Sequence, residues 1–312
     1  MEPMIELSAI IPVTGRYDDV AELYGLYKKG LEATGKSHEI IYVVDGEYPQ
    51  VMNVLKRLIA EGERVKIIKL ARWFGEATAL TIGIQHSSGS ILLTLPAYQQ
   101  VEAFEIPRLV ERLRDCDMVI ARRWPRKDSI LNRIQSGVFH MLLKPVSEFK
   151  FHDIGCGVRV FKNLVAKEIN IYGDQHRFLP ILAHKYGFRV LEVDAAQSKM
   201  DIPSRIYSPG IYVRPILDIF SIFFLVKFTK KPLRFFGILG SSVFAAGFLV
   251  LLYLLYTKLF LGVALGDRPI LLLGTLLVVL GVQVFAIGLL GEIIIFTHAK
   301  DIKEYTIDQV IN

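Results

Sequence analysis

Two long uncharged apolar runs near the end of the chain constrain its fold more than any other feature. One run covers 22 residues, 235–256, and the other covers 23 residues, 269–291. A helix needs about 20 apolar residues to cross the hydrocarbon core of a bilayer. Core helices of soluble proteins are rarely this long and apolar on every side. The sequence therefore predicts two membrane-spanning helices, at about 235–256 and 269–296.

The charges around these runs predict their orientation. The loop between the runs holds only Lys258, Asp267 and Arg268 as charged residues, whereas the outer flanks are basic. Because cytoplasmic segments carry the excess of Lys and Arg, both termini are expected in the cytosol. The N-terminal MEPMIELSAIIPV lacks the regions of a signal peptide, which agrees with a multi-pass protein of the cell (inner) membrane with a cytosolic first domain. The basic flanks are Lys227, Lys230, Lys231 and Arg234 before the first run and His298, Lys300 and Lys303 after the second.

The first 200 residues have the pattern of a soluble α/β protein. Most strand-like runs are continuously apolar, as in parallel strands that are covered on both faces. Helical patterns separate these runs, and the alternating order predicts a doubly wound, Rossmann-like sheet with right-handed crossovers. The expected strands are 7–13, 39–45, 65–70, 90–95, 117–122 and 189–194, and the expected helices are 17–33, 50–61, 75–87 and 103–115.

The segment 211–231 is apolar but is interrupted by Arg214, Asp218 and Lys227. Such a segment fits a helix that lies on the bilayer surface better than a third span. The predicted organisation is a cytosolic domain at 1–205, interfacial amphipathic helices at 206–232, two spans within 233–297 and a cytosolic tail at 298–312. An active site beside lipid headgroups would suit a substrate that is half water-soluble and half lipid.

Three turns at predicted strand ends carry residues suited to ligand binding, because parallel α/β sheets bind ligands at the carboxyl ends of their strands. Gly15 follows the first strand and lets the backbone approach a ligand closely. Asp45 follows the second strand, where a carboxylate can bind a nucleobase or ribose, although Asp-Gly is also a common turn. Arg72 and Gly75 mark the next strand-to-helix junction, where an anion is favoured, and Arg72 is equally readable as a surface cation.

A cluster of basic residues follows the predicted strand 117–122. Arginine forks match phosphate geometry, so this cluster predicts binding of a phosphate or a lipid headgroup, against the ordinary alternative of a solvated charge run. Further along, Asp153 precedes two glycines and a strand, and His176 and Arg177 stand together where a helix begins, which favours an anion contact. The basic cluster is Arg122, Arg123, Arg126, Lys127 and Arg133.

Taken in order, these residues resemble the membrane-bound polyprenyl-phosphate glycosyltransferases of glycosyltransferase family 2, the dolichyl-phosphate mannose synthase type. The resemblance covers nearly the whole chain and rests on the order and spacing of short motifs, none of them decisive alone. It implies a GT-A fold, a nucleotide-sugar donor and a polyprenyl phosphate acceptor at the cytosolic face. The motifs are IIPV, VVDG, LARWFG, RKDxxxxR, DIGCGVRVF, HRFLPILA with GFRVLEV, TKKPLRFFG and LLGE.

The resemblance also implies three sets of site residues. One set would act in catalysis, one would bind the donor, and one would bind the acceptor phosphate. The catalytic set is Asp153, Arg126, Arg133, His176 and Arg177; the donor set is Pro12, Arg16, Asp45, Arg72, Gly75, Pro96, Tyr98 and Gln100; the acceptor set is Arg123, Arg126, Arg133 and Arg177.

The chain departs from the family pattern where a metal is expected. Family members typically read DADLQ, whose acids hold Mg²⁺ or Mn²⁺ against the donor diphosphate, where this chain reads Pro96-Ala97-Tyr98-Gln99-Gln100. The usual Asn-Glu after the first strand is Gly15-Arg16, and the first acid of an Asp-Asp pair is Val44. We therefore expect no metal and no cofactor. Positive charge for the diphosphate would come from Arg16, Arg72 or the 122–126 cluster, or else a metal would need other ligands.

Three functions stay open at this stage. The first is an inverting glycosyltransferase that moves a sugar from a nucleotide-sugar to a polyprenyl phosphate. The second is a catalytically impaired relative that binds lipid phosphate or acts as a scaffold, since the metal-binding acids are missing. The third is transport by the helical hairpin, which the scarcity of polar residues in the spans disfavours. The expected partners are the nucleotide-sugar, the polyprenyl phosphate, the bilayer and further copies of the chain, and no nucleic acid.

Overall fold

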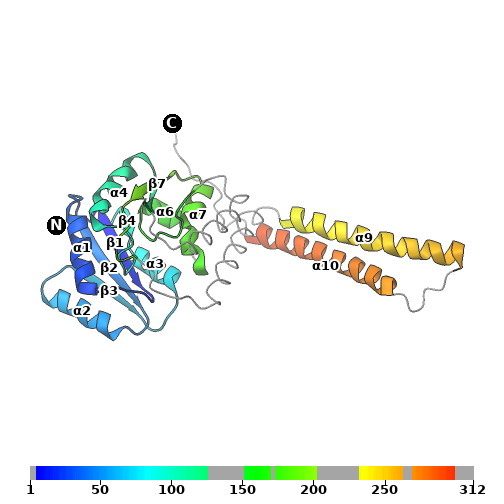
Figure 1. The fold of residues 1–312 in the computed structure, drawn as a ribbon, viewed down its shortest axis with the longest axis horizontal. Helices are drawn as coiled ribbons and strands as arrows, with labels where there is room; N and C mark the ends of the chain where they lie inside the picture. The colour runs from blue at the N-terminus through cyan, green and yellow to red at the C-terminus, as the bar shows by residue number, and fades with distance from the viewer. Residues whose placement is uncertain (1–4, 126–150, 170–172, 202–231, 263–268, 299–312) are drawn as a thin grey trace. The chain divides into compact units, whose positions relative to one another are not determined.

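The computed structural model describes residues 5–125, 151–169, 173–201, 232–262 and 269–298. These residues form two compact units, an α/β domain and a pair of long helices, with the division between residues 219 and 220 (Figure 1). The predicted interfacial helices and cytosolic tail lie almost wholly outside the described residues. Arg126 and Arg133 also lie outside them, so their predicted roles remain predictions.

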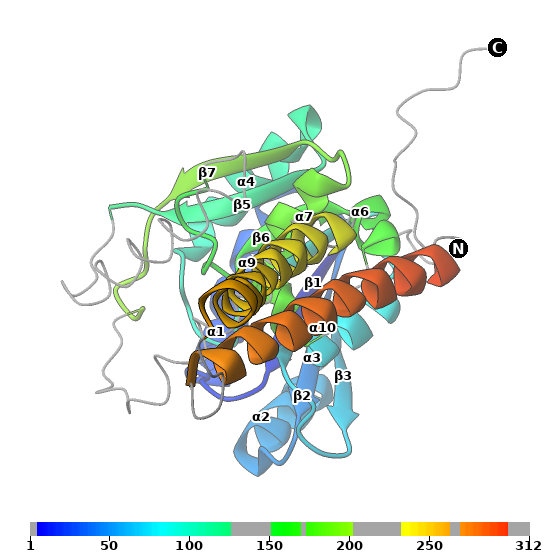
Figure 2. The same cartoon turned by 90° about the vertical axis from the view of Figure 1, so that its right-hand side faces the viewer.

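Within the described part of the chain, seven strands form one sheet in the order β3-β2-β1-β4-β6-β5-β7. All neighbouring pairs are parallel except that β6 is antiparallel to both β4 and β5. Figure 2 shows β7 and β5 side by side at one end of the sheet and β2 and β3 at the other. The strands are β1 (Leu7–Val13), β2 (His38–Asp45), β3 (Val65–Leu70), β4 (Ile91–Thr94), β5 (Met118–Arg123), β6 (Arg159–Lys162) and β7 (Val190–Ala195).

Burial on both faces explains why the central strands read as uninterrupted apolar runs. All seven residues of β1 are buried, and so are the last six residues of β2. The largest fully buried side chains are Tyr27, Tyr42 and Phe161. Strands with helices on both faces have no solvent-facing side, which is the arrangement that the sequence predicted. The α/β class is confirmed.

The connecting helices begin where the local sequence allows them to. Asp19 precedes α1, and its carboxylate accepts the N–H groups of Ala21 and Glu22 at 2.9 and 3.0 Å, which caps the helix. Proline stands in the first turn of α2, α4 and α7, where its missing N–H costs nothing. The helices are α1 (Val20–Glu32), α2 (Pro49–Ala60), α3 (Glu76–Gln85), α4 (Ile106–Arg112), α6 (Asn163–Glu168) and α7 (Leu179–Lys185), with 3₁₀ turns η1 (Ala103–Glu105), η2 (Leu113–Asp115) and η3 (Gly173–Phe178).

Two local predictions differ from the structure. The single helix expected at 103–115 is divided into η1, α4 and η2. Pro107 lies in the first turn of α4, next to the division from η1, and it lacks the N–H that a continuous helix would use there. The strand expected after Gly157 is present as β6, but it runs antiparallel to its neighbours. A mixed sheet of this kind is common among large α/β sheets.

The topology brings three loops to one edge of the sheet. Because β1, β2 and β4 are parallel, their carboxyl ends meet at this edge. The antiparallel β6 brings its amino end to the same place, with Arg159 opposite Thr94. The Thr94 hydroxyl donates to the carbonyl oxygen of Gly157 at 2.7 Å. The residues that follow β1 and β4 therefore lie beside those that precede β6.

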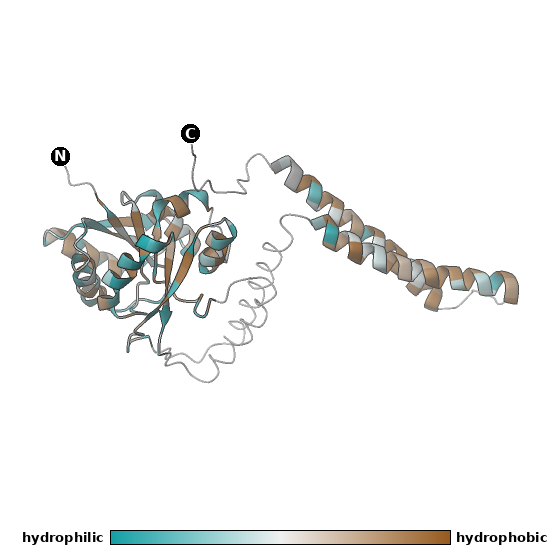
Figure 3. Ribbon diagram, turned by 90° about the horizontal axis from the view of Figure 1, so that it is seen from above, coloured by the Kyte–Doolittle hydropathy of each residue, from teal (hydrophilic) through white to brown (hydrophobic). Residues whose placement is uncertain are grey.

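The second unit is an antiparallel pair of 30-residue helices, α9 (Pro232–Leu261) and α10 (Pro269–His298). Each is about 45 Å long at a rise of about 1.5 Å per residue. Both helices are long and apolar enough to cross a membrane, and Figure 3 shows them coloured mainly as hydrophobic. They contain the two predicted spans. Near the start of α9, the Leu233 N–H donates to the Glu292 carboxylate at 3.4 Å, a favourable position for an acid because it is a helix N-terminus.

Glycines line the contact between α9 and α10. A Cβ atom built on Gly240 would lie 2.6 Å from the backbone nitrogen of Phe285, and one on Gly281 would lie 2.5 Å from that of Phe244. Gly247 faces the backbone of α10 equally closely, with Val278 N at 2.7 Å from its built Cβ. Small residues are typical where membrane helices bring their backbones together. The spacing of Gly240 and Gly247 is seven residues, which keeps both on one face.

Candidate functional site at the carboxyl edge of the sheet

A cavity of about 320 Å³ lies at the edge where β1 and β4 end. Its wall is formed by the loops after these two strands, the first turn of α3, the segment before β6 and the end of η3. Seven of the residues predicted from the sequence contribute to it. Those residues are Pro12, Arg16, Pro96, Tyr98, Gln100, His176 and Arg177, and the lining residues that were not predicted include Glu76, Thr94, Gly157 and Arg159.

The loop 95–100, where the family pattern would place metal-binding acids, is held firmly by hydrogen bonds. The Tyr27 hydroxyl donates to the Pro96 carbonyl at 2.9 Å, and the Asp18 N–H donates to the Ala97 carbonyl at 2.9 Å. In return, the Gln99 N–H donates to the Asp18 carboxylate at 2.9 Å. The loop is therefore a fixed wall of the cavity, built on α1 and the residues just before it.

Two side chains of this loop are joined to each other and to β6. The Gly157 N–H donates to Oε1 of Gln100 at 2.7 Å, and Nε2 of Gln100 donates to the Tyr98 hydroxyl at 2.7 Å. Burial, with added effects of Asp201 and Glu76, raises the pKa of Tyr98 to about 12. The Tyr98 hydroxyl therefore keeps its proton at neutral pH.

Arg16, from the loop after β1, lies over the Tyr98 ring. Its guanidinium carbon is 4.1 Å from the ring centroid, a cation–π distance. One Nη donates to the Met200 carbonyl at 2.9 Å, and the other is 3.9 Å from the Asp201 carboxylate. These contacts hold a positive charge at the cavity wall beside the loop that lacks acids.

On the opposite side of the cavity, Glu76 in the first turn of α3 meets His176 from η3. Nε2 of His176 is 3.2 Å from the Glu76 carboxylate, and Nδ1 is buried with no hydrogen-bond partner among the described residues. Burial acts to raise the pKa of Glu76, but the hydrogen bond and charge of His176, with Arg177 and Arg159 nearby, lower it overall. Glu76 is therefore ionised at neutral pH.

Arg159 is a buried cation behind this pair. Its guanidinium donates to the backbone carbonyls of Ile154 and Cys156, both at 3.1 Å, to that of Arg177 at 3.2 Å and to that of His176. These bonds fasten η3 to the loop before β6. Among the described residues no carboxylate forms a direct ion pair with Arg159, and burial lowers its pKa.

The charges at the cavity wall are predominantly positive. Among the described lining residues, three are arginines, Arg16, Arg159 and Arg177, and one is a carboxylate, Glu76, which already contacts His176. A cleft lined by one sign of charge concentrates ligands of the opposite sign. The cavity is therefore suited to an anion such as a diphosphate.

Asp45, a predicted donor ligand, is not part of the cavity wall. It is fully buried, and its two carboxylate oxygens accept the N–H groups of Phe74 and Gly75 at 2.8 and 2.7 Å. These bonds hold the turn that leads into α3, where Gly75 has a φ of 100° that glycine adopts without strain. Arg72 is exposed and stacks on Phe74 at 5.1 Å. The cavity wall includes none of Asp45, Arg72 and Gly75. Any contact that they make with the donor would therefore lie outside the cavity.

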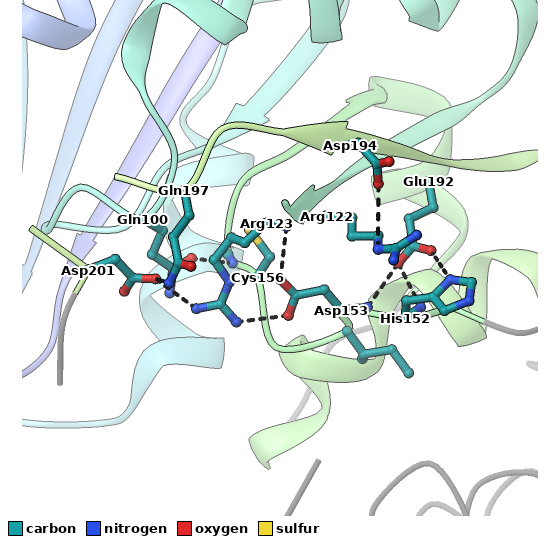
Figure 4. Close-up of polar contacts among 12 residues, drawn as sticks. Gln100, Arg122, Arg123, His152, Asp153, Cys156, Glu192, Asp194, Gln197 and Asp201 are labelled. Atoms are coloured by element: carbon teal, nitrogen blue, oxygen red, sulfur yellow. Dashed lines mark hydrogen bonds and ion pairs between the residues drawn. The ribbon is translucent and has the colours of Figure 1, made fainter. Parts of the chain in front are cut away.

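Arg123 and Asp153 form a buried ion pair, as Figure 4 shows. The Asp153 carboxylate accepts Nε and Nη2 of Arg123 at 2.7 and 2.8 Å, and Asp201 accepts Nη1 at 2.9 Å. Burial works against the charge of Arg123, but these carboxylates raise its pKa overall. Arg123 thus has two anionic partners already, and Asp153, predicted to be catalytic, serves in this structure to hold the end of β5.

The part of the chain that the structure describes contains no group of three or more His, Cys, Asp or Glu side chains that could hold a metal. At the loop 95–100 the oxygens offered by side chains are the Tyr98 phenol and the amides of Gln99 and Gln100. Both amide oxygens already accept a hydrogen bond, from the Ser198 hydroxyl and from the Gly157 N–H. Mg²⁺ and Mn²⁺ prefer carboxylates and water. The residues present do not fit the metal that the family pattern implies.

The three predicted sets of site residues do not include Glu76, Arg159 or Asp201. Glu76 reads as an ordinary acid in the first turn of a helix, and Arg159 reads as a charged residue at the start of a strand. Asp201 stands in a segment with no periodic pattern. Long-range contacts reveal the roles of the two acids: Glu76 contacts His176, and Asp201 contacts Arg16 and Arg123. Such contacts cannot be read from the local sequence.

The sheet order and the site at its carboxyl edge define a GT-A fold. The structure superposes with a TM-score of 0.52 on glucosyl-3-phosphoglycerate synthase from Mycobacterium tuberculosis in complex with phosphoglyceric acid, at 11% identity over 70% of this chain and 79% of that one. Residues 8–169 match the family model described as Glycosyl transferase family 2. The chain belongs to glycosyltransferase family 2.

Two curated relatives align over almost the full chain. A dodecaprenyl-phosphate galacturonate synthase from Rhizobium johnstonii is 29% identical over 95% of this chain and 90% of its own length. An undecaprenyl-phosphate 4-deoxy-4-formamido-L-arabinose transferase from Pectobacterium carotovorum is 28% identical over 98% of this chain and 94% of its own length. Together with α9 and α10, these alignments identify a membrane glycosyltransferase.

Proposed function

We propose that this protein transfers a sugar from a nucleotide-sugar to a polyprenyl phosphate, with inversion at the anomeric carbon. Both relatives described above carry polyprenyl phosphates in their names, and each aligns with at least 95% of this chain. The observation in the structure that carries the proposal is the cation-lined cavity at the carboxyl edge of the sheet, where α/β sheets bind their ligands.

The reaction requires one substitution at carbon. An oxygen of the acceptor phosphate attacks the anomeric carbon from the face opposite the leaving group. The bond between that carbon and the donor diphosphate breaks, and the nucleoside diphosphate leaves with the electron pair. A phosphate acceptor is already anionic at neutral pH, so no strong general base is needed. The protein must instead stabilise negative charge that builds up on the leaving diphosphate.

Arg16 and Arg159 supply that positive charge at the cavity wall. The proposed transfer is independent of divalent metal, because the loop 95–100 offers no carboxylate and Arg16 lies over it instead. A guanidinium presents several donors to phosphate oxygens in a fixed geometry. Arg16 is therefore proposed to stabilise the leaving diphosphate in place of a divalent metal ion, for which the loop 95–100 offers no carboxylate ligand.

The acceptor phosphate is proposed to meet Arg177 together with Arg126 and Arg133, the last two lying outside the described residues. Arg123, also in the predicted acceptor set, would have to share its contacts with Asp153 and Asp201 to bind a phosphate. Its role in the proposal is to place the chain that follows β5, which leads to Arg126 and Arg133.

A second function is favoured by one specific observation. The replacement of the expected acids by Pro96, Ala97 and Tyr98 also fits a protein that has lost catalysis and binds lipid phosphate as a membrane scaffold. The two functions differ in whether the donor binds, because a scaffold would have no need of nucleotide-sugar.

The orientation and assembly that we propose follow from the sequence. The basic residues outside the two predicted spans support a topology with both termini and the glycosyltransferase domain at the cytosolic face of the cell membrane. Further copies of the chain are proposed partners within the bilayer. Neither the sugar nor the nucleotide is specified by these features.

The test uses the purified full-length protein in detergent with a polyprenyl phosphate and a panel of nucleotide-sugars, with lipid-linked products measured by mass spectrometry. One donor is expected to give product, and the rate is expected to survive excess chelator. Activity that disappears with chelator and returns with Mn²⁺ would contradict metal independence. Failure of every donor to bind, by calorimetry in the presence or absence of metal, would leave the scaffold as the function.

A further inference from the structure

The orientation of the Gln100 amide is determined by its neighbours. Gln100 is buried, and the group that meets its Oε1 is the Gly157 N–H, at 2.7 Å. A backbone N–H can only donate, so the atom facing it must be the amide oxygen. The amide nitrogen must then face the Tyr98 hydroxyl, at 2.7 Å. An amide nitrogen can only donate, so the Tyr98 oxygen is the acceptor in this bond.

This direction leaves the proton of Tyr98 free for another partner. A phenol has one O–H to donate, and the bond from Gln100 does not use it. No acceptor for this proton occurs among the described residues, although Tyr98 lines the cavity. The proton is retained at neutral pH, because burial raises the pKa of Tyr98 to about 12. The cavity therefore contains a neutral hydrogen-bond donor next to its cations.

The close packing around Gln100 keeps this arrangement fixed. A Cβ atom built on Gly157 would lie 2.8 Å from Cγ of Pro96 and 3.4 Å from Oε1 of Gln100. The absence of a side chain at Gly157 is thus what lets the loop 95–100 dock on the start of β6. The same loop carries the Tyr98 ring on which Arg16 lies, at 4.1 Å. One ring therefore supports the guanidinium and carries the hydroxyl.

We propose that Tyr98 is a ligand of the donor diphosphate: its ring holds Arg16 in place, and its hydroxyl donates a hydrogen bond to a phosphate oxygen of the same group. Gln100 is a positioning residue, which acts by forcing the Tyr98 hydroxyl to donate toward the cavity. This inference rests on the proposed function, since it assigns a diphosphate to the cavity. The family resemblance already implies a donor role for Tyr98; the inference adds the group of the donor that it binds, the direction of the hydrogen bond and the positioning role of Gln100.

The experiment measures pyrophosphate binding by calorimetry to the full-length protein in detergent with excess chelator. Pyrophosphate is used because it presents the diphosphate without requiring the nucleotide to be known. Tyr98→Phe keeps the ring under Arg16 and removes only the hydroxyl, and it is expected to weaken binding about tenfold, a modest value for a hydrogen bond to a charged group. Arg16→Ala is expected to weaken binding more. Tyr24→Phe is the matched control, because its hydroxyl bonds to Glu63 outside the cavity, and its affinity is expected to equal that of the wild type.

The role of Gln100 is tested by a double-mutant cycle. In Gln100→Glu the carboxylate can accept from both Gly157 and Tyr98, so the Tyr98 proton is drawn away from the cavity. The added negative charge also weakens pyrophosphate binding, with or without Tyr98. The informative quantity is therefore the loss of pyrophosphate affinity that Tyr98→Phe causes in each background. We expect a loss of about tenfold when Gln100 is present and no loss in the Gln100→Glu background. An equal effect in both backgrounds would overturn the positioning role.

Two further outcomes separate the inference from the proposed function. If Arg16→Ala weakens pyrophosphate binding and Tyr98→Phe does not, the Tyr98 assignment is wrong and the metal-independent donor site stands. If the wild-type protein binds no pyrophosphate in the presence of excess chelator, both the Tyr98 assignment and the metal-independent donor site are wrong. Farnesyl phosphate serves as a probe of the acceptor phosphate, and its affinity is expected to be unchanged by Tyr98→Phe. A loss confined to farnesyl phosphate would place Tyr98 at the acceptor instead.

Discussion

At the scale of single residues, a substitution in the buried Arg123–Asp153 ion pair tests whether Asp153 stabilises the fold or acts in catalysis. Asp153→Asn leaves Asp201 as the one carboxylate that contacts Arg123 among the described residues. Breaking a buried pair costs about 3–5 kcal/mol of unfolding free energy. We expect a clear fall in thermal stability, and a fall in activity no larger than the loss of folded protein. The measurement is thermal unfolding in detergent alongside the transfer rate.

Asp194→Asn provides the control for this change. Asp194 pairs with Arg122 at 3.5 Å, and its side chain is 55% exposed, so the expected loss of stability is below about 1 kcal/mol. If Asp153→Asn keeps the wild-type stability and abolishes transfer, Asp153 acts directly on substrate. The prediction made for it from the family resemblance would then hold.

Glu76 gives a prediction for pH dependence. Its folded-state pKa is below its ordinary value of 4.5, because His176 and the nearby arginines outweigh the effect of burial. Ionised Glu76 therefore stabilises the fold above about pH 4.5, and this contribution is lost as the pH falls through the lower folded-state pKa. As the pH falls below about 5, the melting temperature of the wild type should fall more steeply than that of Glu76→Gln. Parallel curves for the two proteins would show that the Glu76–His176 contact does not stabilise the fold.

The residues that the sequence identified and those that it missed differ in a physical way. Arg16 and Tyr98 were found because they depart from a motif at a strand end, and strand ends can be read from local apolar patterns. Asp201 and Glu76 act through partners far away in the chain. Their importance depends on which loops the topology brings together, and no local pattern encodes that.

At the scale of helices and strands, the glycines between α9 and α10 make a testable prediction. Gly281→Ala would place a Cβ atom 2.5 Å from the backbone of Phe244, so the helices must separate and lose packing. Gly237→Ala is the matched control, since its Cβ would lie 3.6 Å from the nearest side-chain atom, an ordinary contact. Both changes raise helix propensity equally. We expect a lower melting temperature and yield only for Gly281→Ala, and equal behaviour of the two variants would rule out close backbone packing.

Element boundaries were predicted well where apolar runs are long and poorly where they are short. The sequence located β1, β2 and the helices α9 and α10 within a few residues, because each contains a long uninterrupted apolar run. The antiparallel direction of β6 was not predicted, since a strand of four residues, Arg159–Lys162, has the same pattern in either direction. The direction is set by its neighbours β4 and β5, which are distant in sequence.

At the scale of the whole molecule, the charge distribution predicts a hairpin with both ends in the cytosol. Accessibility tags inserted at Gly266 and at each terminus, probed from both sides of the membrane, test this orientation. We expect the tag at Gly266 to react only from the outside and the terminal tags only from the inside, because Lys and Arg flank the outer ends of the spans. A loop that reacts from the cytosolic side would contradict the predicted orientation.

The glycine contact between α9 and α10 also bears on the idea that the hairpin conducts a solute. At Gly240, Gly247 and Gly281 the two backbones are so close that even a methyl group would clash. A passage for a sugar or a phosphate headgroup needs a lumen several ångströms wide, and the described residues leave none between the two helices of one chain. A permeation route would have to run between separate copies. We therefore expect the hairpin of a single chain to act as an anchor.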